Sequence, residues 1–258
     1  MRTSDIPVFV ISLENSERRN IISNKLKDFD YEFIDAVYGK NFLSYIEILN
    51  NDLELRARYK RGITPGEYGC SMSHRMIYSR MIEEKLEWAI ILEDDVDFDF
   101  NFQKQIIDLV KKIDKKSLYI LGCQEGLPSF DHVVLSKEKY IEYKDIIFRK
   151  VLKSDRYIYR TAAYLISLET AENILKFTEN NFCLADDWFI YSKNKLFNHI
   201  YLGGFVRHPE ILEGQSTIES ERLYDENYKF IRKVKIFDLL RYIKKIYRPL
   251  YIKFFFDR

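Results

Sequence analysis

The sequence of 258 residues contains little cysteine, glycine or proline. Its cysteines, Cys70, Cys123 and Cys183, are odd in number and form no CxxC pair. This argues against a disulfide framework and against a structural zinc site, and it favours a reducing compartment such as the cytoplasm. Nine glycines and five prolines leave little room for flexible linkers.

Several common sequence signals are also missing. No run approaches the 18 apolar residues expected of a membrane-spanning helix. Residues 1–5 are polar and lead into a strand-like run, so we expect no signal peptide. The motifs GxGxxG, GxxxxGK[ST] and GxSxG are absent. The sequence therefore lacks the fingerprints of dinucleotide oxidoreductases, P-loop proteins and α/β-hydrolases.

The composition is that of a globular protein, with 47% hydrophobic and 31% charged residues. Charge is unevenly distributed, however. Residues 229–258 carry a net charge of +8, which leaves −7 for the preceding 228 residues of a chain whose total is +1. We therefore expect a domain over residues 1–220 and a basic, aromatic helical tail over residues 221–258.

Short apolar runs alternate with segments of helical periodicity. We expect strands at 7–13, 31–37, 88–92, 117–122, 157–168 and 199–206. We expect helices after Ser16 and at 42–59, 64–85, 101–113 and 169–177. Thr64 and Glu67 form a capping box at the start of the third helix, with Pro65 at its first position. This alternation predicts an α/β fold with a mixed, mostly parallel sheet flanked by helices.

The segment with the clearest chemical signal follows the apolar run 88–92. Five carboxylates fall within seven residues, at Glu93, Asp94, Asp95, Asp97 and Asp99. Clustered carboxylates raise each other's pKa unless a cation neutralises them, and oxygen ligands favour Mg²⁺, Mn²⁺ or Ca²⁺.

An EF-hand is excluded, because Phe100 and Ile106 occupy its glycine and glutamate positions. From these residues alone, a solvated acidic loop and a metal site remain equally compatible.

A second acidic pair, Asp186 and Asp187, precedes Trp188. The pair could supply a general base beside an aromatic surface for a sugar ring. A helix N-cap is the simpler interpretation of the pair and is favoured on these residues alone. His208 follows a strand and could bind a metal or phosphate, and His74 lies within a predicted helix; either could equally be an ordinary polar residue.

Several segments together resemble glycosyltransferase family 25, the lipopolysaccharide glycosyltransferases. The resemblance lies in 8–19, 33–39, 64–74 and 89–96, with the pair at 186–187 and the segment 209–218 matching in kind. These segments occur in the order of the family and span most of residues 7–220. The resemblance favours the metal-site interpretation of the acidic loop.

The resemblance implies a GT-A-like fold, a UDP-sugar donor and a divalent metal, Mn²⁺ or Mg²⁺. Glu93-Asp94-Asp95 corresponds to the family's DxD motif, with Asp95 as the metal ligand, assisted by Glu93 and His208. The residues that we expect at the nucleotide and sugar are Ile11, Ser12, Leu13, Arg18, Asp35, Glu67, His74, Glu93 and Asp94.

The implied reaction is an inverting transfer of a hexose to a lipooligosaccharide or another surface glycan. Galactose is the favoured sugar and glucose the next. Inversion requires a base for the acceptor hydroxyl, and we nominate Asp187, with Asp186 as the second choice. Rival interpretations are a metal-dependent phosphohydrolase and a non-catalytic domain that binds nucleotides or glycans.

The basic tail allows three interpretations. It could pack on the domain with a solvated basic face, hold the enzyme on anionic lipid, or bind nucleic acid. We favour anionic lipid on the inner face of a bacterial inner membrane, where a lipid-anchored acceptor would be presented. We expect no nucleic-acid partner, because the body is acidic and lacks a nucleic-acid-binding signature.

Overall fold

The computed structural model describes residues 6–137 and 141–208. The chain divides into two compact units, and one of the boundaries between them, at 72/73, falls within a helix. The first unit consists of residues 1–36 and 73–209, and the described part of the second is residues 37–72. In the part of the chain that is described, no helix combines the length and apolar character needed to cross a membrane. The predicted tail, residues 221–258, lies outside the described residues.

The second unit is helical. It contains a 3₁₀ turn, Gly39–Phe42, the helices α2 (Leu43–Asn51) and α3 (Leu53–Tyr59), and the start of α4 (Pro65–Glu84). The prediction of one helix over 42–59 is wrong. Asp52 divides it, because its carboxylate accepts hydrogen bonds from the next helix's backbone at Glu54 and Leu55.

The capping box at the start of α4 is confirmed. The backbone N–H of Thr64 donates to the Glu67 carboxylate at 3.1 Å, and the N–H of Glu67 donates to the Thr64 hydroxyl at 3.2 Å. Arg61 donates two further hydrogen bonds to the same carboxylate. Glu67 is therefore buried but fully paired within the second unit.

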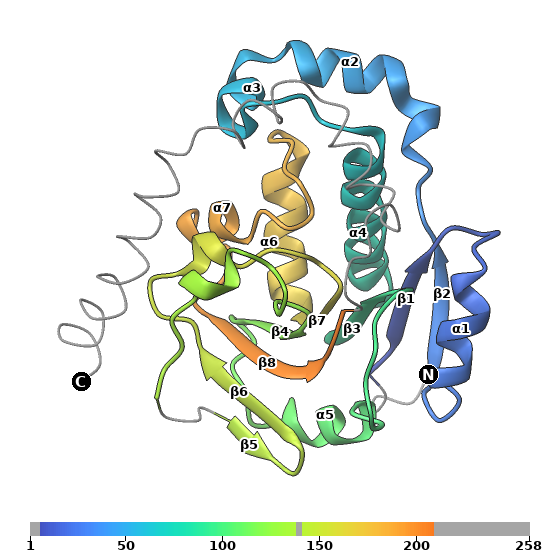
Figure 1. Ribbon diagram of the computed structural model, residues 1–258, viewed down its shortest axis with the longest axis vertical. Helices are drawn as coiled ribbons and strands as arrows, with labels where there is room; N and C mark the ends of the chain where they lie inside the picture. Colours follow the sequence, from blue (N-terminus) through green and yellow to red (C-terminus); the bar gives the residue numbers. More distant parts are fainter. Residues whose placement is uncertain (1–5, 138–140, 209–258) are drawn as a thin grey trace. The chain divides into compact units, whose positions relative to one another are not determined.

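The first unit is built on one eight-stranded sheet (Figure 1). Its strands are β1 (Val8–Ser12), β2 (Tyr31–Asp35), β3 (Trp88–Glu93), β4 (Leu118–Gly122), β5 (Ile141–Tyr143), β6 (Ile146–Lys150), β7 (Ala163–Ser167) and β8 (Ile200–Val206). The spatial order is β2-β1-β3-β7-β4-β8-β6-β5. β1, β2 and β3 pair in parallel, as do β4 and β8, whereas β7 and the β5–β6 hairpin introduce antiparallel pairing. The predicted mixed α/β sheet with flanking helices is confirmed.

This topology brings distant segments to a single sheet edge. Because β7 is antiparallel to both β3 and β4, the carboxyl ends of β1, β2, β3, β4 and β8 lie together, beside the amino end of β7. Ligands of open α/β sheets bind at this edge. We call it the carboxyl edge.

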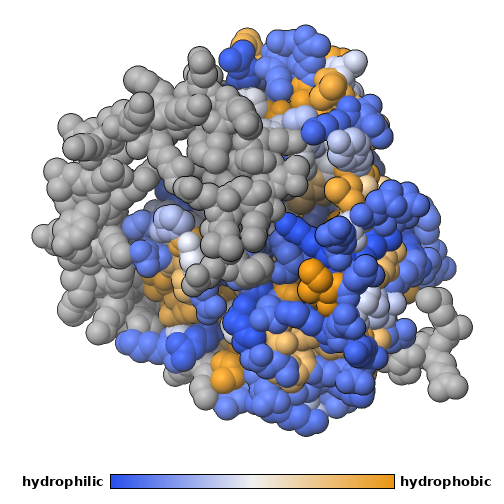
Figure 2. Space-filling view, turned by 45° about the vertical axis from the view of Figure 1, so that its right-hand side comes forward, coloured by the Kyte–Doolittle hydropathy of each residue, from blue (hydrophilic) through white to orange (hydrophobic). Residues whose placement is uncertain are grey.

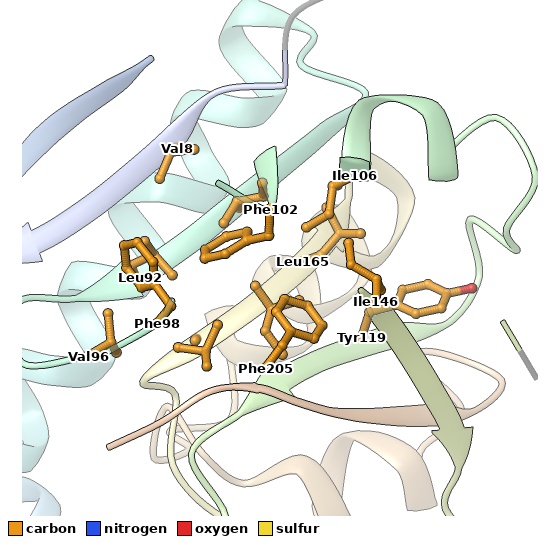
Figure 3. Packing of buried hydrophobic residues seen from close by; sticks show 14 of the residues in the cluster. Val8, Leu92, Val96, Phe98, Phe102, Ile106, Tyr119, Ile146, Leu165 and Phe205 are labelled. Carbon is orange, nitrogen blue, oxygen red and sulfur yellow. The ribbon is translucent and has the colours of Figure 1, made fainter. Parts of the chain in front are cut away.

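Alternation along β3 produces a core on each face of the sheet. Ile90 and Leu92 pack on the face covered by α1 (Arg18–Lys25) and α5 (Gln103–Leu109). Figure 3 shows how the aromatic rings of this core interlock with Leu92 and Leu165. Ala89 and Ile91 pack on the other face, under α4, α6 (Leu168–Glu179) and α7 (Trp188–Lys193). Both faces of the central strands are covered, so these strands read as continuous apolar runs.

Two predicted boundaries are corrected. The strand expected over 157–168 is confined to β7, because Arg160 adopts a left-handed backbone conformation with φ of 61° and breaks the extended chain. Residues 155–157 instead form a 3₁₀ turn, and β5 and β6 were not predicted. Helix α1 begins at Arg18, two residues after Ser16, although the Ser16 hydroxyl still accepts from the Arg18 N–H.

The described surface in the view of Figure 2 is mainly hydrophilic, with hydrophobic residues in small separate groups. The larger exposed apolar side chains of the first unit are Leu13, Ile21, Met76, Tyr159 and Phe189. Scattered exposure of this kind is ordinary for a folded domain.

Candidate active site

The first two acids of the loop after β3 contact the first strand and the first helix of the chain. Ser12, at the end of β1, donates a hydrogen bond of 2.5 Å to the Asp94 carboxylate, and Ser16 donates one of 3.2 Å. Arg18 lies 3.5 Å from Asp94 and 3.0 Å from Asp95. The predicted nucleotide residues Ser12, Arg18 and Asp94 therefore meet at the carboxyl edge.

Asp95 has the most unusual environment of the five acids. Its Oδ2 atom lies 3.0 Å from Arg18 and 3.4 Å from Nε2 of His208, which follows β8. Its Oδ1 atom is buried and accepts no hydrogen bond from any described residue. Burial raises the pKa of Asp95, but the hydrogen bond from His208 and the positive charges of His208 and Arg18 outweigh it and hold the pKa below its ordinary value.

The residues at Asp95 fit a divalent cation. An ionised carboxylate with one buried, unpaired oxygen offers an acceptor that a metal would satisfy. Nε2 of His208 faces the same carboxylate, and this nitrogen could bind Mn²⁺ beside the oxygen ligands once the proton that it donates to Asp95 is lost. The structure thus brings together two of the three residues predicted to bind metal.

The remaining acids of the loop have protein partners. Arg207 contacts Asp99 at 2.6 Å and Asp97 at 3.3 Å, and Lys25 also pairs with Asp97. The hydrogen bond from Lys25 holds the pKa of Asp97 below its ordinary value, and that from Arg207 does the same for Asp99. The five carboxylates therefore do not share one cation, because lysine and arginine side chains neutralise the last two.

Glu93 makes a separate set of contacts, on the α4 side of β3. Its Oε1 atom accepts a hydrogen bond of 2.6 Å from Thr161, just before β7, and lies 3.9 Å from Nε2 of His74. His74 is buried, and its Nδ1 atom lies 2.7 Å from the hydroxyl of Tyr164. The metal-binding prediction for Glu93 and the sugar-binding prediction for His74 stay predictions.

Asp35, at the end of β2, is the exposed partner of Arg19. The guanidinium of Arg19 lies 2.5 Å from the Asp35 carboxylate and donates to the carbonyl of Ser12 at 2.8 Å. It also lies over the ring of Phe33, 4.8 Å from its centroid. Arg19 therefore fixes an acidic group at the ends of β1 and β2. The neighbouring residues Ile11 and Leu13 are buried and exposed, respectively.

The acidic pair at 186–187 lies close to the amino end of β7. Asp186 accepts a hydrogen bond of 3.2 Å from the backbone N–H of Arg160, and Asp187 accepts one of 2.9 Å from that of Leu184. Burial, followed by the charges of Asp186 and Asp187, raises the pKa of Tyr159. Arg160, whose N–H donates to Asp186, immediately precedes Thr161, whose hydroxyl donates to Glu93.

The tryptophan next to this pair does not face solvent. Trp188 is completely buried, packs against Tyr164 and donates its indole N–H to the carbonyl of Arg160 at 3.0 Å. The proposal that it stacks on a sugar is therefore wrong, because its ring belongs to the core under α7. Asp187 stands at the N-cap position of α7 but makes no side-chain capping bond to that helix.

Sequence inspection missed the residues that link the predicted ones. Arg19, Thr161, Tyr164 and Arg207 each contact a predicted residue or a neighbouring acid from a different element. Arg19 ends the family-like segment 8–19 without a role that its sequence indicates, and the other three lie in no motif. The spacing of these residues from their partners reaches 108 positions for Arg207. Only the sheet topology brings them together.

Comparison with known families decides the assignment. The model of glycosyltransferase family 25, described as an LPS biosynthesis protein, matches residues 5–190. The chain belongs to glycosyltransferase family 25. The matched part contains every predicted site residue of this family-25 chain except His208.

Relatives within family 25 differ in length and description. The lipooligosaccharide biosynthesis protein lic2B of Haemophilus influenzae is 28% identical over 267 residues, covering 97% of this chain and 96% of the relative. Procollagen galactosyltransferase 1-B of Xenopus laevis is 29% identical over 180 residues, and the match covers 65% of this chain. That match spans about 28% of the procollagen galactosyltransferase.

Two further similarities concern a relative that is described as probable inactive and a solved structure. The probable inactive glycosyltransferase 25 family member 3 of Rattus norvegicus is 28% identical over 178 residues, 65% of this chain and 29% of the relative. Among solved structures, a glycosyltransferase involved in the glycosylation of the major capsid of PBCV-1 has a TM-score of 0.38 and 10% identity. That likeness covers 78% of this chain and 82% of the other.

Proposed function

We propose that this chain is a metal-dependent, inverting hexosyltransferase that uses a UDP-sugar donor. Galactose is the favoured sugar and glucose the next, and the acceptor is a lipooligosaccharide or another surface glycan. Family membership and the lipooligosaccharide biosynthesis relative support this proposal. The observation that carries it is the buried, unpaired oxygen of Asp95 at the carboxyl edge.

Asp95 and His208 would hold the cation, Mn²⁺ or Mg²⁺, with Glu93 as a third candidate. When bound, the metal supplies positive charge that stabilises the nucleoside diphosphate leaving group. Arg18 already places a guanidinium beside Asp94 and Asp95 and would add to that stabilisation.

The nucleotide would lie along the ends of β1 and β2. Asp35, held by Arg19, would accept hydrogen bonds from ribose hydroxyls or the base. Ser12 and Ser16 hold Asp94 in place, and Ile11 and Leu13 continue the same strand end. Contact of Glu67 or His74 with the donor sugar or the acceptor stays a prediction from the sequence.

Asp187 would remove the proton of the acceptor hydroxyl, with Asp186 as the alternative base. The contact of Asp186 with Arg160 places this pair beside the start of β7, on the same sheet edge as Glu93. If Asp187→Asn kept near wild-type turnover with unchanged metal affinity, Asp187 would not be the base.

The acceptor would be presented at the inner face of a bacterial inner membrane. The basic tail, which lies outside the described residues, would contact anionic lipid there. Flotation with anionic vesicles should bring up the full chain but not a chain that ends at residue 229. Equal flotation of both would remove this role from the tail.

A non-catalytic nucleotide- or glycan-binding domain is the second candidate. One observation favours it, namely that some relatives carry the description probable inactive. Such a domain would bind UDP in a metal-dependent way without turnover on any acceptor. A metal-dependent phosphohydrolase would instead release phosphate without an acceptor.

The test is release of nucleoside diphosphate from a panel of nucleotide sugars, with Mn²⁺, Mg²⁺ or EDTA, and with or without truncated lipooligosaccharide. We compare wild type with Asp95→Asn and, as a matched control, Asp99→Asn, whose carboxylate is exposed and paired with Arg207. Loss of an outer-shell partner of a metal ligand typically costs roughly tenfold to a hundredfold, so loss of the ligand in the first variant should lower turnover by at least that much. The control should stay near wild type.

Release from one donor that depends on metal, rises with acceptor and is lost only in Asp95→Asn would establish the transferase and name its sugar. Equal activity of Asp95→Asn and wild type would remove Asp95 from the metal site. No release from any donor by folded protein would favour the binding-domain alternative.

A further inference from the structure

A chain of buried polar side chains leads from Glu93 into the interior of the first unit. His74 and Tyr78 lie one helical turn apart on α4, and Tyr164 lies on β7. The Nδ1 atom of His74 is 2.7 Å from the Tyr164 hydroxyl, which is 2.8 Å from the Tyr78 hydroxyl. All three side chains are at most 2% exposed.

The second ring nitrogen of His74 faces the active-site loop. Nε2 is buried and has no hydrogen-bond partner among the described residues. Oε1 of Glu93 lies 3.9 Å from Nε2, and this oxygen also accepts from Thr161. A buried polar atom without a partner is costly and rare, so its position calls for a physical explanation.

The tautomer of His74 decides whether Nε2 attracts or repels the Glu93 carboxylate. A neutral imidazole carries its proton on one nitrogen only. If Nδ1 carried it, the bare lone pair of Nε2 would face the Glu93 carboxylate, and two acceptors would oppose each other. If the Tyr164 hydroxyl donates to Nδ1, the proton lies on Nε2 and points to the carboxylate. The second arrangement is electrostatically favoured in a buried site.

We propose that Tyr164 fixes His74 as the Nε2–H tautomer, and that this N–H together with the Thr161 hydroxyl orients the Glu93 carboxylate. His74 is then a positioning residue that acts through Glu93, not a residue that touches the sugar. The role of this orientation in transfer rests on the proposed function.

The orientation of the Glu93 carboxylate decides which of its two oxygens can meet a ligand at the carboxyl edge. The Thr161 hydroxyl donates to Oε1 of Glu93, and Nε2 of His74 faces this same oxygen at 3.9 Å, whereas no hydrogen bond of the described residues engages Oε2. Oε2 is therefore the oxygen left for a ligand. An approach of His74 by about 1 Å would bring Nε2 within hydrogen-bonding distance of Oε1.

The direct test is ¹⁵N NMR of the histidine rings in the full chain without donor or acceptor. The four histidines of the sequence give few signals, and loss of one set in His74→Gln assigns His74. Wild type should show Nε2–H and unprotonated Nδ1 for His74. Tyr164→Phe keeps the ring, removes the hydroxyl, and should shift His74 toward the other tautomer.

Tyr119→Phe is the matched control for this loss of a buried hydroxyl. Tyr119 is equally buried on the neighbouring strand β4, but its hydroxyl donates to the Asp114 carbonyl at 3.0 Å. Its removal should leave the His74 spectrum unchanged. An Nδ1–H tautomer or a doubly protonated ring in wild type would overturn the proposal, as would an unchanged tautomer in Tyr164→Phe.

Kinetics separate positioning from a merely structural role. His74→Gln keeps a donor near the place of Nε2, whereas the shorter side chain of His74→Asn does not reach it. The kcat of transfer should fall roughly tenfold to a hundredfold in His74→Asn and Tyr164→Phe, with an unchanged acceptor KM, and only a few-fold in His74→Gln. Equal losses of kcat in His74→Gln and His74→Asn, with the near-ultraviolet circular dichroism of both variants unchanged, would contradict a positioning role for His74. If wild type transfers no sugar, the proposed function fails while the NMR result still decides the tautomer.

Discussion

Arg18 and Arg19 are neighbours in sequence that contact different acids. Arg18 lies beside Asp94 and Asp95, in the loop after β3. Arg19 lies beside Asp35, at the end of β2, and also holds the Ser12 carbonyl. The first turn of α1 therefore delivers one positive charge to the proposed metal site and another to the proposed nucleoside site.

Arg18 should oppose metal binding in the absence of nucleotide. Its guanidinium lies 3.0 Å from Oδ2 of Asp95, so it competes with a cation for that carboxylate. Arg18→Gln should raise the affinity for Mn²⁺ roughly threefold to tenfold, because a like charge is removed from a largely buried site. Isothermal titration with Mn²⁺ measures this. Arg19→Gln is the matched control and should leave the affinity unchanged; a lower affinity in Arg18→Gln would contradict this reasoning.

At the residue scale, the sequence locates groups but not their partners. The apolar run 88–92 places Glu93, Asp94 and Asp95 at a strand end, and the structure agrees. The contact between Arg18 and Asp95 spans 77 positions, and that between His74 and Tyr164 spans 90. Such pairs follow from strand order, which local patterns do not encode.

At the element scale, the close approach of β4 and β8 depends on one glycine. A Cβ atom at Gly122 would lie 1.9 Å from the backbone carbonyl oxygen of Val206. Gly122 ends β4, and Val206 ends β8 immediately before Arg207 and His208. The close contact between these two strand ends therefore constrains the positions of Arg207 and His208.

Gly122→Ala should destabilise the protein and disturb the site together. The added methyl group must push one backbone away from the other, which we expect to cost about 1–3 kcal/mol of unfolding free energy. Urea unfolding measures the loss. Gly204→Ala is the control within β8, since its Cβ would meet nothing closer than 3.9 Å. Equal stability of the two variants would show that β4 and β8 are not so close.

Helix and strand boundaries were predicted where a local signal existed. Thr64 and Glu67 announce the start of α4 through their reciprocal hydrogen bonds. Asp52 carries an equally good N-cap signal, but its flanking apolar periodicity continues through the break. The left-handed conformation of Arg160 has no signal in the sequence, because arginine rarely adopts it.

At the scale of the whole molecule, the sheet of the first unit separates two cores. Adjacent residues of β3 contribute to different cores: Ile90 packs under α1 and α5, and Ile91 under α4, α6 and α7. Both side chains are completely buried. The predicted α/β layering follows from this, because a strand that is apolar at every position must be covered on both faces.

Ile90→Ala and Ile91→Ala should therefore destabilise the protein to a similar extent. Each leaves a cavity in a packed core, which we expect to cost about 2–5 kcal/mol. Ile21→Ala, on the exposed side of α1 with 60% exposure, should change the unfolding free energy by less than about 0.5 kcal/mol. Urea unfolding of the three variants is the measurement. A small loss for only one of the two β3 variants would show that one face is loosely packed.

The separate pairing of the five acids after β3 sets how many ions the loop can take up. Lys25 and Arg207 neutralise Asp97 and Asp99, and Thr161 and Ser12 hold Glu93 and Asp94 by hydrogen bonds. Only Asp95 keeps a buried oxygen without a partner. A run of five carboxylates would suggest a site for two ions, but among the described residues this loop keeps one buried oxygen without a partner, and we expect the loop to bind one ion.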